Sequence, residues 1–182
     1  MTVRIPPLKY ESASAAQREA LDQVKRALGK VPSLYATFGQ APKVLSALVQ
    51  LQGALGKGTL SARDRHLIDL HVSQLNGCPY CVSAHTAFAK ADGLTDADAL
   101  RFRDGIGQTP RDAAILALAR RVTRTGGAGA GAELAQAREA GLSDPEVVEV
   151  LAATGVRSLI NAVAIVSATE VDWPAVPRTP EP

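Results

Sequence analysis

The sequence predicts an all-α protein. Aromatic residues make up only 4% of the chain, alanine is abundant, and valine, isoleucine and threonine never alternate with polar residues over the length of a strand. Residues that cap helix N-termini recur along the chain, each ahead of a residue that favours the first helical turn. With 182 residues, 46% of them hydrophobic and 21% charged, the chain has a globular composition, and we expect one compact domain.

The first part of the chain predicts three helices. A charged, amphipathic helix fits residues 12–27, and it is ended by Gly29 and by Pro32, which cannot donate a backbone hydrogen bond to an earlier carbonyl. Two shorter helices fit residues 33–38 and 42–55. We interpret this segment as a helical arm with a packing role.

From residue 61 onward, the helix starts become regular. Four hydroxyl residues each stand three positions ahead of an acidic residue, a pattern in which the hydroxyl caps the helix and the carboxylate lies in its first turn. Two of these starts also carry a proline at or next to the first helical position. The four pairs are Ser61 with Asp64, Thr95 with Asp98, Thr109 with Asp112, and Ser143 with Glu146.

These starts indicate an internal repeat of two copies. Thr109 follows Ser61 by 48 positions, and Ser143 follows Thr95 by the same interval. An ungapped match in this register predicts a duplication, in which each copy is a helix, a turn, a second helix ended by glycine, and a third helix. The alternative is a chance match between alanine-rich helices. Eight identical pairs carry the prediction: Arg63 and Arg111, Asp64 and Asp112, Leu70 and Leu118, Ala87 and Ala135, Ala89 and Ala137, Gly93 and Gly141, Leu94 and Leu142, and Asp96 and Asp144.

The repeat divides the chain into three parts. Residues 1–60 form the arm, residues 61–172 form a helical core, and the proline-rich residues 173–182 are expected to form an extended tail. Within the core, the two copies span about 61–108 and 109–156. Two such copies are expected to pack as a helical bundle.

Composition and charge exclude several classes of partner. The net charge is +2 with no basic stripe, which argues against nucleic acid, and the uncharged run 158–169 is too short for a membrane span and predicts a buried helix. Residues 1–7 contain no apolar run of a secretory signal, so we expect a cytoplasmic protein. We expect no flavin, haem or nucleotide cofactor, since the lone glycine-rich run 126–131 is interpreted as a loop.

All thiols and imidazoles of the chain fall in one segment. Cys78 and Cys81 are the two cysteines, and the three histidines, His66, His71 and His85, lie within twenty positions of them. In the second copy the positions of both cysteines, His66 and His85 hold other residues. A shared fold therefore does not require these side chains, which indicates a chemical role for them.

The spacing of this segment favours thiol chemistry. Pro79 fits the first position of a helix, so that Cys78 lies at or next to the N-cap and Cys81 in the first turn, where unpaired N–H groups and the helix dipole favour a thiolate. His85 follows Cys81 by four residues and shares its helix face, as a general base or as an imidazolium partner. His66 is a candidate second base or orienting residue for His85, and His71 is expected to face elsewhere.

Three interpretations of these residues compete. The favoured one is a redox-active thiol pair that closes to a disulfide and reopens. The second is a metal site built from Cys78, Cys81, His85 and His66, although a second pair of cysteines or histidines at ligand spacing is missing. The third is a purely structural role, with small buried thiols and a core histidine.

Residues 60–68 and 76–86 resemble the alkylhydroperoxidase D (AhpD) and carboxymuconolactone decarboxylase superfamily, above all its peroxidase-related branch. Residues 28–35 and 169–174 resemble the flanks of that branch, so that the resemblance covers nearly the whole chain. It implies an AhpD-like helical bundle, homo-oligomers, and a peroxidase with a redox-active cysteine pair and a histidine proton relay. Carried over by position, Cys78 and Cys81 match the pair and His85 matches the relay histidine.

One position departs from the family pattern. The family carries a glutamate twelve residues before the first cysteine, where this chain has His66. We therefore expect that His85 lacks its carboxylate partner and that thiol reactivity falls as the two histidines become protonated.

The predicted function is reduction of hydroperoxides through a Cys78–Cys81 disulfide, with electrons from an external dithiol reductant or adaptor protein. We expect Cys81 to be activated by His85 and to attack the peroxide, and Cys78 to be the more exposed thiol that completes the disulfide. The alternatives are a lactone decarboxylase and a redox-sensing or metal-binding module. Apolar faces on the arm and on the long final helix favour a homo-oligomer.

Overall fold

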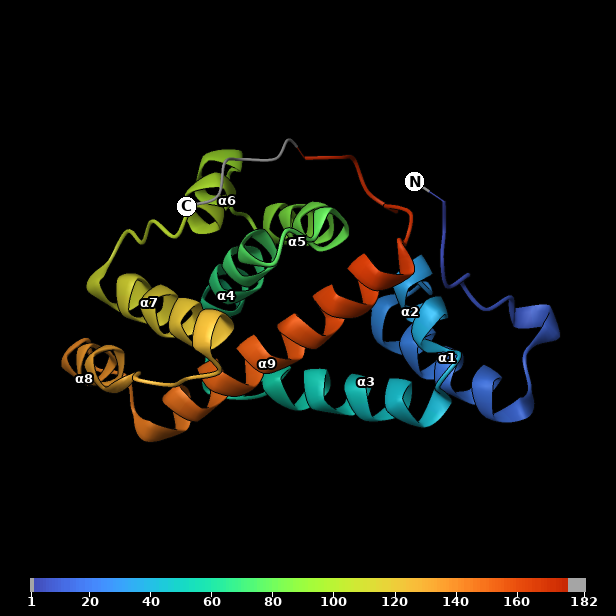
Figure 1. Cartoon of the computed structure of the whole chain (residues 1–182), viewed down its shortest axis with the longest axis horizontal. Coiled ribbons are helices and arrows are strands. Elements are labelled where there is room, and N and C mark those ends of the chain that lie inside the picture. Colours follow the sequence, from blue (N-terminus) through green and yellow to red (C-terminus); the bar gives the residue numbers. More distant parts are fainter. Residues whose placement is uncertain (1, 177–182) are drawn as a thin grey trace.

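The computed structural model describes residues 2–176, and all regular structure in this range is helical (Figure 1). The predicted all-α fold is confirmed. A 3-10 turn, η1, precedes nine α-helices within the described residues. They are η1 (Tyr10–Ser12), α1 (Ala15–Leu28), α2 (Ser33–Phe38), α3 (Pro42–Gly56), α4 (Ala62–Leu75), α5 (Pro79–Ala91), α6 (Asp96–Arg103), α7 (Pro110–Thr125), α8 (Gly131–Glu139) and α9 (Asp144–Ser167).

Helix α4 is the centre of the bundle, and it packs against α5, α6, α7 and α9. Its sequence explains this position, because every residue from 66 to 75 except Asp69 is buried, on all sides of the helix. Leu67 and Leu70 belong to a hydrophobic cluster that also contains Ile115 and Val150. Polar side chains on the C-terminal part of α4 are therefore surrounded by other helices.

The four predicted capping residues begin helices where the sequence places them. Ser61, Thr95, Thr109 and Ser143 each accept a hydrogen bond from the backbone N–H three residues later. Helices α4 and α7 thus start 48 positions apart, as do α6 and α9. These recurring starts agree with the predicted repeat, and the duplication itself stays a prediction.

Two ion pairs link the starts of α4 and α7. Arg63 binds Asp112 through two nitrogen–oxygen contacts of 2.5 and 2.9 Å, and Arg111 lies 3.2 Å from Asp64. Arg63 and Arg111 are equivalent in the repeat, as are the two aspartates. Each copy therefore supplies an arginine to the capping region of the other.

The arm packs on the half of the bundle that contains the cysteines. Helix α1 begins at Ala15 rather than at residue 12, because Ser14 is its N-cap and forms a reciprocal capping box with Gln17. Buried residues of α1, α2 and α3 form a second hydrophobic cluster with Cys78 and Cys81 and with the C-terminal half of α9. The arm thus packs around the cysteine pair as well as on the core.

Helix α9 crosses the molecule diagonally and packs against α3, α4 and α7 (Figure 1). Among the described residues it is the one helix with the length and apolar composition of a membrane span, and half of its most apolar stretch is buried inside the protein. Its packing makes it a core helix, which agrees with the predicted buried helix.

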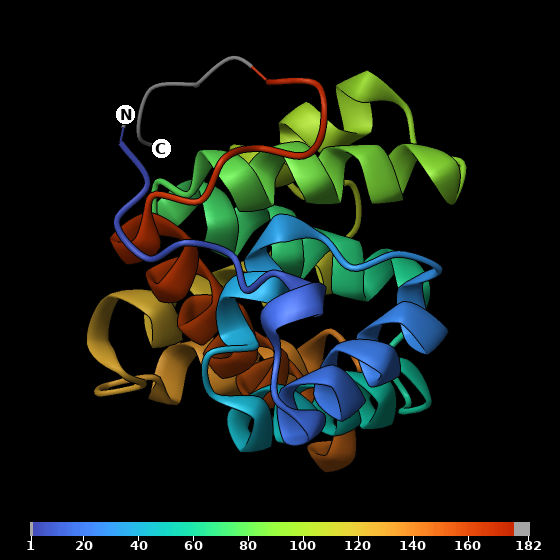
Figure 2. The ribbon, with the colours of Figure 1, turned by 90° about the vertical axis from the view of Figure 1, so that its right-hand side faces the viewer.

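After α9 the chain runs without regular structure over α5, as Figure 2 shows. The Asp172 carboxylate accepts hydrogen bonds from the backbone N–H and the hydroxyl of Ser33 and from the hydroxyl of Tyr80, at 2.8, 2.6 and 2.6 Å. Residues 174–176 follow a bend at Trp173 and have no regular structure, and the remainder of the predicted tail lies outside the described residues. The C-terminal segment is thereby attached to both the arm and α5.

Candidate active site

The two cysteines lie at the N-terminus of α5, as the sequence predicts. Cys78 is the N-cap residue, Pro79 occupies the first turn, and the Cys78 sulfur accepts a hydrogen bond from the Cys81 N–H at 3.3 Å. Both thiols are reduced in this structure. The geometry therefore holds the two side chains on one side of the first turn, next to unpaired N–H groups that favour a thiolate.

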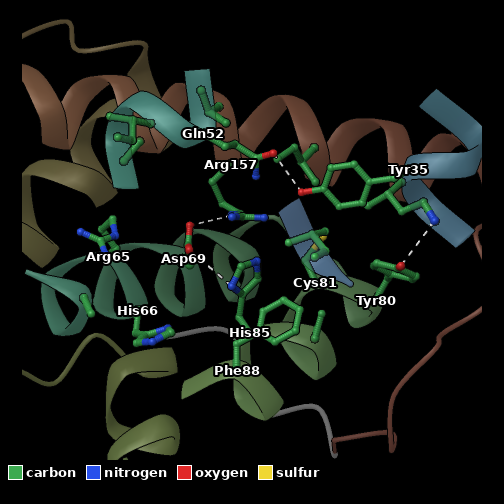
Figure 3. A pocket seen from close by; sticks show the side chains of 18 of the residues that line it. Tyr35, Gln52, Arg65, His66, Asp69, Tyr80, Cys81, His85, Phe88 and Arg157 are labelled. Carbon is green, nitrogen blue, oxygen red and sulfur yellow. Dashed lines mark hydrogen bonds and ion pairs between the residues drawn. The ribbon is translucent and has the colours of Figure 1, made fainter. Parts of the chain in front are cut away.

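Only one of the two cysteines lines a cavity. A cavity of about 260 Å³ lies between α2, α3, α4, α5 and α9, and its wall contains Cys81, His85 and His66 (Figure 3). Cys78 and Cys81 are each 1% exposed. The expectation that Cys78 is the more exposed thiol is wrong, because both cysteines are buried to the same extent in one hydrophobic cluster.

The environment favours ionisation of one thiol over the other. The pKa of Cys81 is lowered, first by a hydrogen bond with the Cys78 thiol and then, against the effect of burial, by Arg157 and by a hydrogen bond with Asn161. The pKa of Cys78 is raised by its hydrogen bond to Cys81 and by burial. Cys81 is therefore the more readily ionised thiol of the pair, and Cys78 is the thiol that keeps its proton more strongly.

His85 has a carboxylate partner that the sequence analysis did not identify. Its Nδ1 lies 3.3 Å from Asp69 Oδ2 on α4, and Asp69 Oδ1 accepts a hydrogen bond of 2.7 Å from Arg157 Nε on α9. Burial, followed by the nearby Arg157 cation, lowers the pKa of His85 to about 3. The expectation that His85 lacks a carboxylate partner is wrong, because Asp69 lies beside it. Of the two predicted roles, general base or imidazolium partner, the lowered pKa favours the neutral ring and with it the general base.

His66 lines the same cavity and binds a different carboxylate. Its Nε2 lies 2.7 Å from Asp92 Oδ2, at the end of α5. Its Nδ1 is buried and has no hydrogen-bond partner among the described residues. The structure thus brings His66 and His85 to one cavity, but each is oriented by its own aspartate.

His71 lies away from this cavity, as predicted. It is fully buried, with Nδ1 at 3.2 Å from the Arg103 carbonyl oxygen and Nε2 at 3.4 Å from Arg120 Nε. Burial lowers its pKa to about 4. Its partners explain the burial without any role in the site.

Aromatic side chains close the outer part of the cavity. Trp173, from the C-terminal segment, packs edge to face on Tyr80 and Phe88, with ring centroids 5.4 and 5.3 Å apart. Phe88 in turn packs edge to face on His85, and Lys30 of the arm lies over the Trp173 ring. The arm and the C-terminal segment are therefore part of the site, which extends the packing role predicted for the arm.

Sequence reasoning missed Asp69, Arg157 and Asn161. The signal for Arg157 was available, since it is the single charged residue between Glu149 and Glu170 in an apolar helix. A buried charge in such a run needs a charged partner.

The predicted metal ligands are not arranged as a metal site. Among residues 2–176, no group of three or more histidine, cysteine, aspartate or glutamate side chains has the proximity to hold a metal ion. His66 and His85 each bind an aspartate, and the Cys78 sulfur bonds the backbone of its own helix. The arrangement instead places one thiol with a lowered pKa and two oriented imidazoles around the same cavity.

Comparison with known sequences gives one family and one curated relative. The carboxymuconolactone decarboxylase family model matches residues 42–121, which include both cysteines and His85 but not Arg157. The uncharacterized protein YdfG of Bacillus subtilis (strain 168) is 30% identical over 56 residues. That match covers 31% of this chain and 38% of the length of YdfG.

Solved structures extend the similarity over the whole fold. An uncharacterized peroxidase-related protein from Ralstonia eutropha JMP134, described as an alkylhydroperoxidase AhpD core, aligns with a TM-score of 0.81 at 24% identity, over 93% of this chain and 92% of that chain. A protein of unknown function from Agrobacterium tumefaciens, linked to antioxidant defence as an AhpD, aligns with a TM-score of 0.69 at 25% identity, over 75% and 96% of the two chains. The chain has the AhpD-like fold, and the family match together with these structures supports its assignment to the AhpD and carboxymuconolactone decarboxylase superfamily.

Proposed function

We propose that the protein is a thiol-dependent peroxidase that reduces organic hydroperoxides. The observation that carries this proposal is the cysteine pair at the start of α5, in which Cys81 lines the cavity and the sulfur of Cys78, the N-cap residue, accepts a hydrogen bond from the Cys81 N–H. A hydroperoxide in the cavity meets a single thiol, and the second thiol is already within hydrogen-bonding distance for disulfide formation. The antioxidant and peroxidase descriptions of the structural relatives support the same chemistry.

The proposed reaction has two steps. The Cys81 thiolate attacks the terminal oxygen of the hydroperoxide, the O–O bond breaks, and one proton is taken up, which gives Cys81 sulfenic acid and an alcohol. The Cys78 thiol then attacks the Cys81 sulfur and releases water, which leaves a Cys78–Cys81 disulfide. An external dithiol returns both cysteines to thiols and is itself oxidised to a disulfide.

The two imidazoles are suited to proton transfer in this cycle. Asp92 fixes the orientation of His66 and leaves its buried Nδ1 without a partner, so that this atom can exchange a proton with an oxygen in the cavity. Asp69 fixes His85 on the helix face of Cys81. We assign to His66 the protonation of the departing alkoxide, and to His85 the positioning of the hydroperoxide.

The reductant must reach the disulfide through the cavity. Both sulfurs are 1% exposed, and the cavity of about 260 Å³ admits only a slender group. We propose a dithiol on an extended carrier, in the cytoplasm, and no metal or organic cofactor of the protein itself.

The proposal is tested by counting thiols before and after one equivalent of hydroperoxide, with cumene hydroperoxide and hydrogen peroxide as the two probes. The wild-type protein is expected to lose two thiols per chain and to regain them with dithiothreitol. Mass spectrometry of Cys78→Ser is expected to show sulfenic acid at Cys81, whereas Cys81→Ser keeps its remaining thiol. Two unreacted thiols in the wild-type protein, or bound zinc with inert thiols in metal analysis, would overturn the proposal.

A further inference from the structure

Arg157 is a buried cation next to the reactive cysteine. Its side chain is 7% exposed, and its position in an apolar helix gives it no access to bulk water. Burying a guanidinium group is costly unless it is paired, and Asp69 supplies the pairing carboxylate. Figure 3 shows the guanidinium between the Asp69 carboxylate and the Cys81 side chain.

Asp69 binds one edge of the Arg157 guanidinium group. The bond to Asp69 uses Nε, and the Nη groups extend from it toward α2 and α5. Attraction of Cys81 to Arg157 outweighs its repulsion by Asp69, so the cation is the dominant charge at the sulfur. Asn161, one turn after Arg157 on α9, binds the same thiol and is held by hydrogen bonds with Asn76 and Ser73.

The other ionisable groups around Cys81 do not compete for this role. On α5, His85 is neutral because its pKa is about 3, and Cys78 stays protonated because its pKa is raised. On α2, burial raises the pKa of the Tyr35 hydroxyl, which also remains neutral. The hydroxyl of Tyr80 on α5 also stays neutral, because burial raises its pKa. The ionisable groups that line the cavity or contact the thiol are Tyr35 of α2, Arg65, His66 and Asp69 of α4, Cys78, Tyr80, His85 and Asp92 of α5 and its two ends, and Arg157 of α9.

We propose that Arg157, anchored by Asp69, is the residue that stabilises the Cys81 thiolate, in place of the histidine that follows the cysteine pair. This inference rests on the proposed thiol chemistry of Cys81. A guanidinium keeps its charge at every pH that the protein encounters, so Cys81 retains its cationic partner under mildly acidic conditions. The charge of an imidazole would change in that range, and its effect on the thiol would change with it.

The test is the rate of alkylation of Cys81 by iodoacetamide as a function of pH, in the Cys78→Ser background. In Arg157→Met, the midpoint of the profile is expected to rise by about one unit and the rate at pH 7 to fall about tenfold, since one unit is a tenfold change in thiolate below the midpoint. Arg157→Lys keeps the charge and is expected to recover most of the shift. His85→Gln is expected to leave the midpoint in place.

A double variant separates the cation from its anchor. Arg157→Met alone leaves Asp69 buried without its cation, which could itself repel the thiolate or impair folding. Arg157→Met with Asp69→Asn removes both charges, and its midpoint is expected to stay raised, with circular dichroism as the control for folding. A double variant with the wild-type midpoint would overturn the proposal, as would an unchanged midpoint in Arg157→Met or a rise in His85→Gln instead. Alkylation needs no peroxide, so failure of the peroxidase reaction remains distinguishable from failure of this inference.

Discussion

Two histidines, His85 and His71, make the stability of the fold depend on pH. His85 and His71 have pKa values lowered to about 3 and about 4, in both cases mainly by burial. In the unfolded chain a histidine has a pKa of about 6.5. Below that pH these histidines bind protons in the unfolded state but not in the folded state, so the free energy of unfolding falls as the pH decreases.

We predict that each of these histidines lowers the free energy of unfolding by about 2 kcal/mol between pH 8 and pH 5. Urea denaturation at pH 8, 6.5 and 5 measures the total. His71→Gln removes one titrating group outside the site, and its stability is expected to depend less on pH by about 2 kcal/mol over this range. The pKa of Asp69 is lowered, so this carboxylate takes up a proton only below pH 4 and does not contribute to the change measured between pH 8 and pH 5. An equal pH dependence in the variant and the wild type would contradict the prediction.

Contacts between residues close in sequence were predictable, and contacts between residues far apart in sequence were not. The placement of Cys78, Cys81 and His85 follows from N-capping and from the four-residue spacing of one helix. Asp69 and Arg157 meet across 88 positions, and only the packing of α4 against α9 brings them together. The sequence analysis therefore placed the cysteine pair and His85 on one helix, and it did not find Asp69 or Arg157, which contact them from other helices.

The starts of α4 and α7 are stabilised by a shared set of polar contacts. Asp112 is buried, and besides binding Arg63 it accepts a hydrogen bond of 2.8 Å from the Gln108 N–H. Its pKa is lowered by these partners in spite of burial. Each aspartate thus serves its own helix start and the arginine of the other copy.

We predict that Asp112→Ala lowers the free energy of unfolding by about 2 kcal/mol, because it removes a bidentate ion pair at a buried carboxylate and the acceptor of the Gln108 N–H. Thermal or urea denaturation at pH 7 measures this loss. Arg138→Ala is the matched control, since the Arg138 side chain is 60% exposed and pairs with Asp144, whose side chain is 78% exposed. The control is expected to show no measurable change, and a loss equal to that of Asp112→Ala would contradict the argument.

Helix starts were predictable because capping is a local interaction. Ser61, Thr95, Thr109 and Ser143 all cap helices in the structure. The start of α1 was placed too early, because Ser12 and Ser14 offer the same hydroxyl and only Ser14 is followed by a glutamine that completes the capping box.

At the scale of the whole molecule, residues 2–176 leave a face of α9 uncovered. From Val148 to the end of α9, seven residues are exposed, and none of them is charged: Val148, Leu151, Gly155, Leu159, Ala162, Ile165 and Val166. Their spacing of three and four residues forms one continuous stripe, and the two small residues allow close approach of another helix. This surface is where the expected homo-oligomer would form, with a second copy of the chain against α9.

We predict that the wild-type protein is an oligomer and that Leu159→Asp with Val166→Asp lowers its mass toward the 19.0 kDa of one chain. Light scattering after size-exclusion chromatography measures the mass, and circular dichroism checks the fold. Leu100→Asp, at an exposed position of α6, is the control and is expected to leave the mass unchanged. A monomeric wild-type protein would rule out this interface.

The position of Trp173 has a practical consequence for following the chemistry. It is the only tryptophan of the chain, it lines the cavity, and its ring touches Tyr80, which lies between the two cysteines. Closing the sulfur pair changes the chemical groups on both sides of Tyr80 in the sequence, and we expect this to change the surroundings of the indole. The intrinsic fluorescence of Trp173 is therefore expected to report oxidation and reduction of the cysteine pair without a label. Stopped-flow fluorescence measures the rates of both steps.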